Sequence, residues 1–178
     1  MVKYYKKVFV DRPWNRPNLT SNGVLGGDSF AVSCDSSNGI DGNTVVSNAY
    51  QATDGNSNTY FSMWSTTATT VQSYYMYNPN PLRVKNIKIV NFHTNQYAIW
   101  RAIDGNLKGS NDGSNWEIIN TFSNNNNATL TINGNLNKVY KYLAIEITKR
   151  TSVAESRMLS FNEIQIDATE LITTTVRK

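Results

Sequence analysis

Short runs of β-forming residues, each bounded by turn signals, recur along most of this chain. Val, Ile, Thr, Tyr and Phe dominate six of these runs, and we expect strands over 74–77, 84–92, 116–122, 128–132, 138–148 and 161–166. The sequence shows neither sustained helical periodicity nor an internal repeat. Many short strands without intervening helices predict an all-β sandwich or jelly roll.

Turn chemistry separates these runs at four dipeptides, Asp54-Gly55, Asp104-Gly105, Asp112-Gly113 and Asn133-Gly134. We expect the last of them to close a two-residue hairpin. Trp116, which follows the third turn, is expected to pack into the core. Within 138–148, the period-2 alternation places Leu143, Ile145 and Ile147 on the core face.

The composition favours one domain without a nucleic-acid partner. At 178 residues the chain is long enough for a substantial core, and no Pro/Gly/Ser-rich linker divides it. The net charge is only +4, and the basic residues form two small clusters, Lys3, Lys6 and Lys7 in one and Lys149 and Arg150 in the other. A nucleic-acid binder would show a longer basic stripe with interleaved aromatic residues.

The chain has one cysteine, Cys34, and one histidine, His93. An internal disulfide is therefore excluded, and almost nothing is left for a zinc site. No apolar run approaches the length of a membrane span, so we expect no membrane insertion. The N-terminal residues lack the apolar core and cleavage site of a signal peptide. Export would then need another route, such as assembly into a larger particle.

Three segments, in order, resemble the discoidin family, also called the coagulation-factor type C or galactose-binding-like fold. They are residues 52–62 (ATDGNSNTYFS), 107–116 (LKGSNDGSNW) and 161–166 (FNEIQI). They are similar to the family's early A-x-D-G-N-x-x-T-x-W stretch, its central S-x-D-G-x-x-W hairpin and its closing E-I-x-I/F strand. One departure is Phe61, which stands where the family has Trp, so the local packing is expected to differ.

The resemblance implies a discoidin-like jelly-roll β-sandwich over residues 29–167. It leaves residues 1–28 as an N-terminal extension that could serve in attachment, and residues 168–178 as a C-terminal tail.

Members of this family commonly hold a calcium ion at the first segment, joined by a carboxylate from the closing strand. By resemblance, the ligands of a structural Ca²⁺ would be the side chains of Asp54, Thr59 and Glu163 and backbone carbonyls near Ala52, Asn56 and Ser62. Such a cation takes roughly 6–8 oxygen ligands, and a turn supplies several at once. The alternative is that Asp54-Gly55 is a plain tight turn and that Glu163 is hydrogen-bonded at the end of the sheet. No ligand series follows Asp112-Gly113, so we expect a β-turn there.

Ligand binding in this fold usually belongs to loops at one end of the barrel, here 34–49, 93–102 and 149–159. The candidate ligand-binding residues are His93, Asn95, Tyr97, Trp100, Arg101 and Arg157. An aromatic ring can stack on the C–H face of a pyranose while polar groups hold its hydroxyls. The alternative is that Trp100 plugs the barrel end and that the two arginines are solvated or paired with acids.

Catalysis finds little support in the sequence. A Ser–His–Asp arrangement would have to use His93, and neither a G-x-S-x-G motif nor a Gly-rich phosphate loop occurs. We therefore expect a non-catalytic module that binds a cell-surface glycan.

Residues 14–23 (WNRPNLTSNG), followed by Gly26-Gly27, resemble modules found on bacteriophage virions. This resemblance implies a place on the virion surface or outside the cell, in a fibre, spike or decoration that recognises the host. The alternative is a structural virion protein that contacts only other virion proteins, with its termini, 1–13 and 169–178, clasping neighbouring subunits. A homo-oligomer fits either hypothesis.

Overall fold

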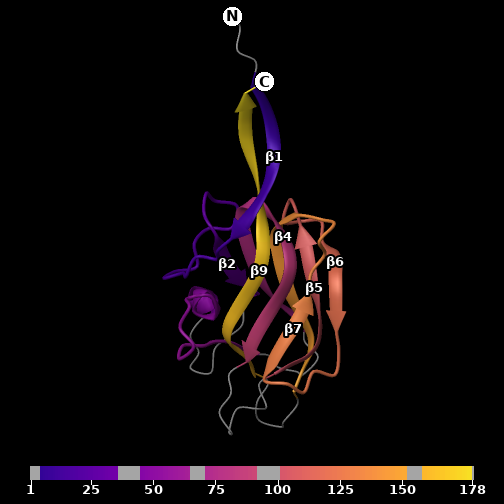
Figure 1. Cartoon of the computed structure of the whole chain (residues 1–178). Helices are drawn as coiled ribbons and strands as arrows, with labels where there is room; N and C mark the ends of the chain where they lie inside the picture. Colours follow the sequence, from indigo (N-terminus) through magenta and orange to yellow (C-terminus); the bar gives the residue numbers. More distant parts are fainter. Residues whose placement is uncertain (1–4, 36–44, 65–70, 92–100, 152–157, 178) are drawn as a thin grey trace, which may run out of the picture.

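The computed structural model describes residues 5–35, 45–64, 71–91, 101–151 and 158–177. Within these ranges the elements are β1 (Tyr5–Trp14), β2 (Ala31–Cys34), the 3₁₀ helix η1 (Val45–Ala52), β3 (Phe61–Trp64), β4 (Gln72–Asn91), β5 (Ala102–Ser110), β6 (Glu117–Phe122), β7 (Thr129–Asn133), β8 (Tyr140–Arg150) and β9 (Met158–Arg177). All strand pairs among them are antiparallel. The expected all-β sandwich is confirmed (Figure 1).

Strand β4 carries the chain from one layer of the sandwich to the other. Its first part, 72–77, pairs with β2 and β8, whereas its last part, 82–91, pairs with β7 and β9, with one further pairing of Leu82 to Tyr140 of β8. The register with β8 breaks between Tyr77 and Leu82, across Pro79 and Pro81. Proline has no N–H to donate to a ladder, so the two prolines interrupt pairing at this crossing. The runs 74–77 and 84–92, expected as two strands, thus belong to one.

The core lies between these layers. Leu143, Ile145 and Ile147 of β8 are buried, which confirms the predicted core face. The rings of Phe61 and Tyr74 lie with their centroids 5.3 Å apart, and Phe161 packs edge-on against Tyr74 at 6.2 Å. Burying a large apolar side chain contributes roughly 1.5–3 kcal/mol to stability. This aromatic cluster therefore holds β3, β4 and β9 together.

The two ends of the chain pair with each other. Strand β1 runs along the C-terminal half of β9, from Trp14 opposite Ala168 to Tyr5 opposite Arg177. The pairing of β9 with β4 ends at Glu170, so beyond this point β9 is paired with β1 alone among the described residues. The result is a two-stranded ribbon that stands clear of the body (Figure 1). The predicted extension and tail therefore form one element together.

The expected hairpin at Asn133-Gly134 is wrong. Asn133 ends β7, which pairs with β4 and not with the next strand, β8. Gly134 donates its N–H to the carbonyl of Lys85 at 2.8 Å, and a Cβ on Gly134 would lie 2.1 Å from the carbonyl oxygen of Val84. This glycine is needed because two stretches of backbone approach closely, and not because the chain turns.

The expected turn at Asp104-Gly105 is also wrong, because both residues lie inside β5. The register with β8 shifts between them, and a Cβ on Gly105 would lie 2.2 Å from the carbonyl oxygen of Glu146. Glycine inside a strand commonly marks such a bulge or close approach.

The turn at Asp112-Gly113 is confirmed, since it joins β5 to β6 and Gly113 has φ 76°. Hydrogen bonds from the backbone N–H and the side-chain amide of Asn115 hold the pKa of Asp112 well below its usual range. The core position expected for Trp116 is wrong, because its indole is half-buried on the surface. It donates to the carbonyl of Gly113 and packs against Tyr75 at 5.8 Å.

Candidate functional site

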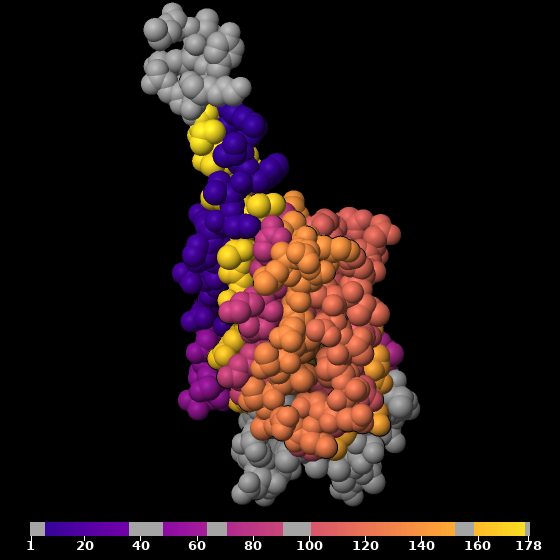
Figure 2. All heavy atoms as spheres, turned by 45° about the vertical axis from the view of Figure 1, so that its right-hand side comes forward, coloured from indigo at the N-terminus to yellow at the C-terminus, as the bar shows by residue number. Residues whose placement is uncertain are grey.

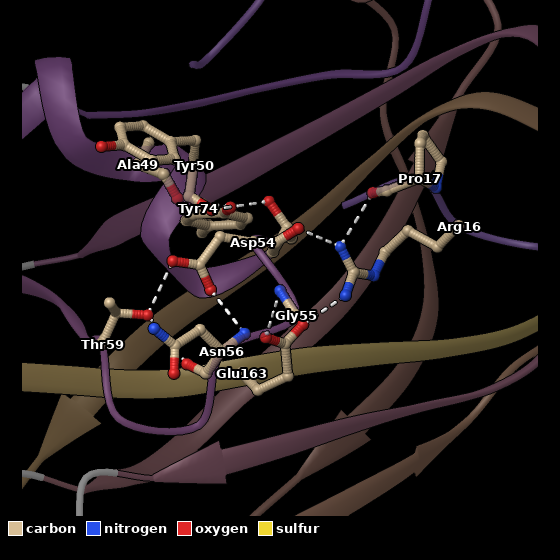
Figure 3. Close-up of polar contacts among 11 residues, drawn as sticks. Arg16, Pro17, Ala49, Tyr50, Asp54, Gly55, Asn56, Thr59, Tyr74 and Glu163 are labelled. Carbon is tan, nitrogen blue, oxygen red and sulfur yellow. Dashed lines mark hydrogen bonds and ion pairs between the residues drawn. The ribbon is translucent and has the colours of Figure 1, made fainter. Parts of the chain in front are cut away.

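The Asp54–Thr59 loop closes on itself through the Asp54 carboxylate. One carboxylate oxygen accepts the Asn56 N–H at 2.8 Å, and the other accepts the Thr59 hydroxyl at 2.7 Å (Figure 3). Gly55, between Asp54 and Asn56 in the sequence, has φ 78°, a left-handed conformation that favours glycine. The tight turn predicted at Asp54-Gly55 is therefore confirmed.

Glu163, on β9, reaches the same loop and meets an arginine there. One of its oxygens accepts the Gly55 N–H at 3.1 Å, and the other forms an ion pair with Arg16. The Arg16 guanidinium also donates to the carbonyls of Thr53 and Pro17 (Figure 3). The side chains of Arg16 and Glu163 are only 10% and 8% exposed. This arrangement is a buried charge pair that ties the segment after β1 to the closing strand.

The charge on Glu163 depends on this pairing. Burial raises the pKa of Glu163, and the nearby Asp54 carboxylate raises it further. The Arg16 guanidinium and the Gly55 N–H act in the opposite direction, and the net pKa still lies above the ordinary value. Since a buried carboxylate is costly without a partner, Arg16 is the group that compensates it.

The carbonyl groups predicted near Ala52 and Ser62 belong to the elements that flank this loop. Ala52 is buried at the end of η1, and Ser62 lies in β3 opposite Ser160, where its backbone belongs to the β3–β9 ladder. The structure thus brings the side chains of Asp54, Thr59 and Glu163 to one loop with Asn56.

The donor set, as arranged, does not fit calcium. A hard cation needs free carboxylate and carbonyl oxygens around it. Here the Arg16 guanidinium already engages one oxygen of Glu163 and the carbonyl of Thr53. No cluster of three or more His, Cys, Asp or Glu side chains suited to a metal occurs in the described part of the chain. A calcium ion would have to displace Arg16, and calcium binding itself stays a prediction.

Arg16 is the residue at this site that the sequence reasoning did not single out. It lies in the stretch that resembles virion modules and outside the discoidin motifs. A buried arginine can be recognised in a sequence only when its acidic partner is known. Glu163 lies 147 positions away, so the sequence does not show that the two residues pair.

Most of the predicted ligand-binding residues, His93, Asn95, Tyr97, Trp100 and Arg157, lie outside the described residues. Arg101 is among the described residues and directly precedes β5. Its guanidinium donates to the carbonyl of Asn126 at 2.5 Å. Its backbone N–H reaches the Thr151 hydroxyl at 3.3 Å, and the Thr151 N–H donates to the Arg101 carbonyl at 3.1 Å. This pairing extends the β5–β8 ladder and brings residues 101 and 151, which lie within two of the three candidate loops, side by side.

A second arginine lies beside this pair. Arg150 ends β8 opposite Ala102 and is only 1% exposed. Burial lowers its pKa to about 10. In the sequence it stands only as part of a small basic cluster with Lys149, whose side chain is instead exposed.

No described helix is both long and apolar enough to cross a membrane.

Comparisons by sequence found no similar protein, whereas comparison of the structure found many. Neither a scan against protein-family models nor a search of curated proteins found a match. Many solved structures match, among them the module CpGH89CBM32-5 from Clostridium perfringens in complex with GalNAc-β-1,3-galactose, with TM-score 0.63 and 14% identity over 78% of this chain and 94% of that one.

Two further matches come from the same bacterium. The family 32 carbohydrate-binding module of NanJ, in complex with galactose, gives TM-score 0.57 and 17% identity over 80% of this chain and 93% of that one. A family 89 glycoside hydrolase in complex with 2-acetamido-1,2-dideoxynojirmycin gives TM-score 0.55 and 18% identity over 82% of this chain, but 14% of that one. At these identities the likeness concerns the fold. The chain therefore has the discoidin-like, galactose-binding-like β-sandwich fold of the family 32 carbohydrate-binding modules.

Proposed function

We propose that this chain is a non-catalytic carbohydrate-binding module that recognises a glycan on a cell surface. The observation that supports the proposal most directly is the shared fold with modules solved in complex with galactose and with GalNAc-β-1,3-galactose. A fold alone does not imply a function, so the proposal also needs a site.

The paired backbones of Arg101 and Thr151 support a site at one end of the sandwich. This pairing joins one described residue of the 93–102 loop to one described residue of the 149–159 loop. Trp100 directly precedes Arg101 in the sequence. An indole face and a guanidinium at one loop end would supply the stacking surface and the hydroxyl donors that a pyranose requires.

Calorimetric titration and a glycan array test this site. The intact chain is titrated with galactose and with GalNAc-β-1,3-galactose, alongside Trp100→Ala and Arg101→Ala. We expect each variant to weaken binding at least about tenfold, because stacking and hydroxyl contacts each contribute on the order of 1 kcal/mol or more. Trp116→Ala is the matched control, since Trp116 follows the β5–β6 turn at the opposite end of β5. Equal affinity of Trp100→Ala and the intact chain would exclude the proposed site.

We further propose that the module stands on the surface of a phage particle, as part of a fibre, spike or decoration. The support is the likeness of residues 14–23 to virion modules. Antibodies raised against the chain should then label intact particles in electron micrographs. Failure to label particles that contain the chain by mass spectrometry would contradict a surface position.

The second candidate function is a structural virion protein that contacts only other proteins. The ribbon of β1 and β9 favours it, because that element stands clear of the body and offers a surface for another protein (Figure 1). A chain that binds no sugar on the array while remaining part of the particle would support this alternative.

A further inference from the structure

The outer part of the β1–β9 ribbon, hereafter the arm, consists of residues 5–11 of β1 and 171–177 of β9. Figure 2 shows the arm projecting from the body, with β1 in indigo and β9 in yellow. Strand β1 is the last strand in the sheet order and pairs with β9 alone within the described residues. One whole edge of β1 therefore has no strand beside it in the described part of the chain.

The arm exposes three large apolar side chains. Phe9 is 74% exposed, Val10 41% and Val176 43%. A two-stranded ribbon that stands alone in water is only marginally stable, and an exposed apolar edge strand readily pairs with another strand. These features indicate that a further strand covers the edge of β1.

The sequence of β1 is complementary to itself in one antiparallel register. A two-fold axis perpendicular to the sheet keeps each side chain on its own face, so only registers that place a residue opposite itself are allowed. With Phe9 opposite its own copy, Lys7 lies opposite Asp11 on both sides of the centre and Val8 lies opposite Val10. Lys6 and Arg12 also lie opposite each other further out, but Arg12 is already paired with Glu170 of its own chain. Cross-strand pairs of opposite charge and of aromatic rings stabilise a sheet.

The neighbouring allowed registers lose this match. A shift to Val8 at the centre sets Lys7 opposite Phe9, and a shift to Val10 sets Lys7 opposite Pro13. The Asp11 carboxylate also lies 3.3 Å from the Arg83 guanidinium, but it is 42% exposed and so can accept a second partner.

We propose that the chain forms a two-fold dimer by antiparallel pairing of β1 with β1 of a second copy, with Phe9 at the centre. The arms then form a four-stranded sheet with β9 on each outer side. Lys7 of each copy pairs with Asp11 of the other, and the two bodies lie at opposite ends of this sheet.

Sedimentation equilibrium of the full chain tests the proposal. We expect twice the monomer mass of 20.0 kDa, in a concentration-dependent equilibrium. Lys7→Glu and Asp11→Lys should each weaken association at least about tenfold, because both charge pairs become repulsive. An equimolar mixture of the two variants should restore the dimer, since both pairs between positions 7 and 11 across that interface again join opposite charges. The control Lys85→Glu breaks an exposed pair with Asp167 on the body and should leave association unchanged.

A cysteine crosslink tests the register. Opposite Cα atoms in an antiparallel pair lie roughly 4.5–5.5 Å apart, within the span of a disulfide. Phe9→Cys should therefore give a covalent dimer on oxidation. Val10→Cys, whose partner in this register is Val8, should not. Cys34 is buried and should not contribute.

A monomer at all concentrations would overturn the proposal. A trimer, which two-fold pairing of β1 cannot give, or a dimer that the mixed variants fail to restore, would overturn it as well.

Discussion

Arg16 and Glu163 lie 147 positions apart in the sequence and form a buried ion pair beside the Asp54–Thr59 loop. The pair links the segment that follows β1 to the closing strand β9. A calcium ion was expected from the discoidin resemblance to make the link between that loop and Glu163. In this structure an arginine of the chain itself makes a comparable link.

Removing the guanidinium should destabilise the fold strongly. In Arg16→Met the Glu163 carboxylate stays buried without its partner, and breaking a buried pair costs roughly 3–5 kcal/mol. Urea unfolding measures this loss. The control Lys85→Met breaks the exposed pair with Asp167 and should cost less than about 1 kcal/mol.

The double variant Arg16→Met, Glu163→Gln separates the missing partner from lost packing. It should be more stable than Arg16→Met alone, because no unpaired charge remains. If the double variant is less stable than either single variant, the compensating role of Arg16 is wrong.

Calcium should leave the melting temperature of the intact chain unchanged, because Arg16 already engages Glu163. In Arg16→Ala, by contrast, Asp54 and Glu163 lack that cation, and calcium should raise Tm by binding the folded state only. Scanning calorimetry with excess calcium and again with chelator measures both effects. Adding Glu163→Gln to Arg16→Ala should abolish the response. A calcium-dependent rise in the intact chain would instead support the ion expected from the family resemblance.

Acid should weaken the base of the arm through Glu170. Burial alone would raise the pKa of Glu170, but hydrogen bonds from Asn80, Asn78 and Arg12 outweigh it, and the net pKa is lowered. Because the pKa of Glu170 is lower in the folded state than its unfolded value of about 4.5, the ionised carboxylate stabilises the fold at pH values above 4.5. This stabilisation is lost as the pH falls through the folded-state pKa. Unfolding free energies measured between roughly pH 3 and 7 should therefore fall more steeply with acid for the intact chain than for Glu170→Gln. Parallel curves would contradict this role.

Gly134→Ala should destabilise the fold by at least about 1–3 kcal/mol, because the new Cβ would meet the Val84 carbonyl oxygen. Asn133→Ala should cost less than about 0.5 kcal/mol, since Asn133 is exposed. Chemical unfolding of both variants measures the difference. A two-residue hairpin turn would instead make both positions sensitive, so similar losses would contradict the close-approach explanation.

The alternation within β8 shows how far local pattern extends. It identified Leu143, Ile145 and Ile147 as core residues. The same alternation, extended by two residues, predicts that Lys149 is buried. The register shifts between β5 and β8 reverse the phase at this end, so that Arg150 is buried and Lys149 is exposed. A bulge depends on the partner strand, and therefore no pattern within β8 alone could predict it.

The glycines show the same limit. Gly113 and Gly55 have positive φ angles and make the turns that their Asp-Gly pairs predict. Gly105 and Gly134 carry the same local signature, but their role is set by the backbone of another strand. Turn chemistry and close approach both select glycine, so the dipeptide does not distinguish them.

The sequence by itself determined the all-β class, the positions of β6, β7 and β8, parts of β4 and β9, and the core face of β8, because side-chain alternation and turn chemistry act over a few residues. The discoidin motifs also indicated that Asp54, Thr59 and Glu163 meet. Only the tertiary structure decided that Arg16 completes this cluster, that β4 crosses between the layers, and that the two ends of the chain pair as an arm. Each of these depends on contacts between residues distant in the sequence, which become neighbours only when the sandwich closes.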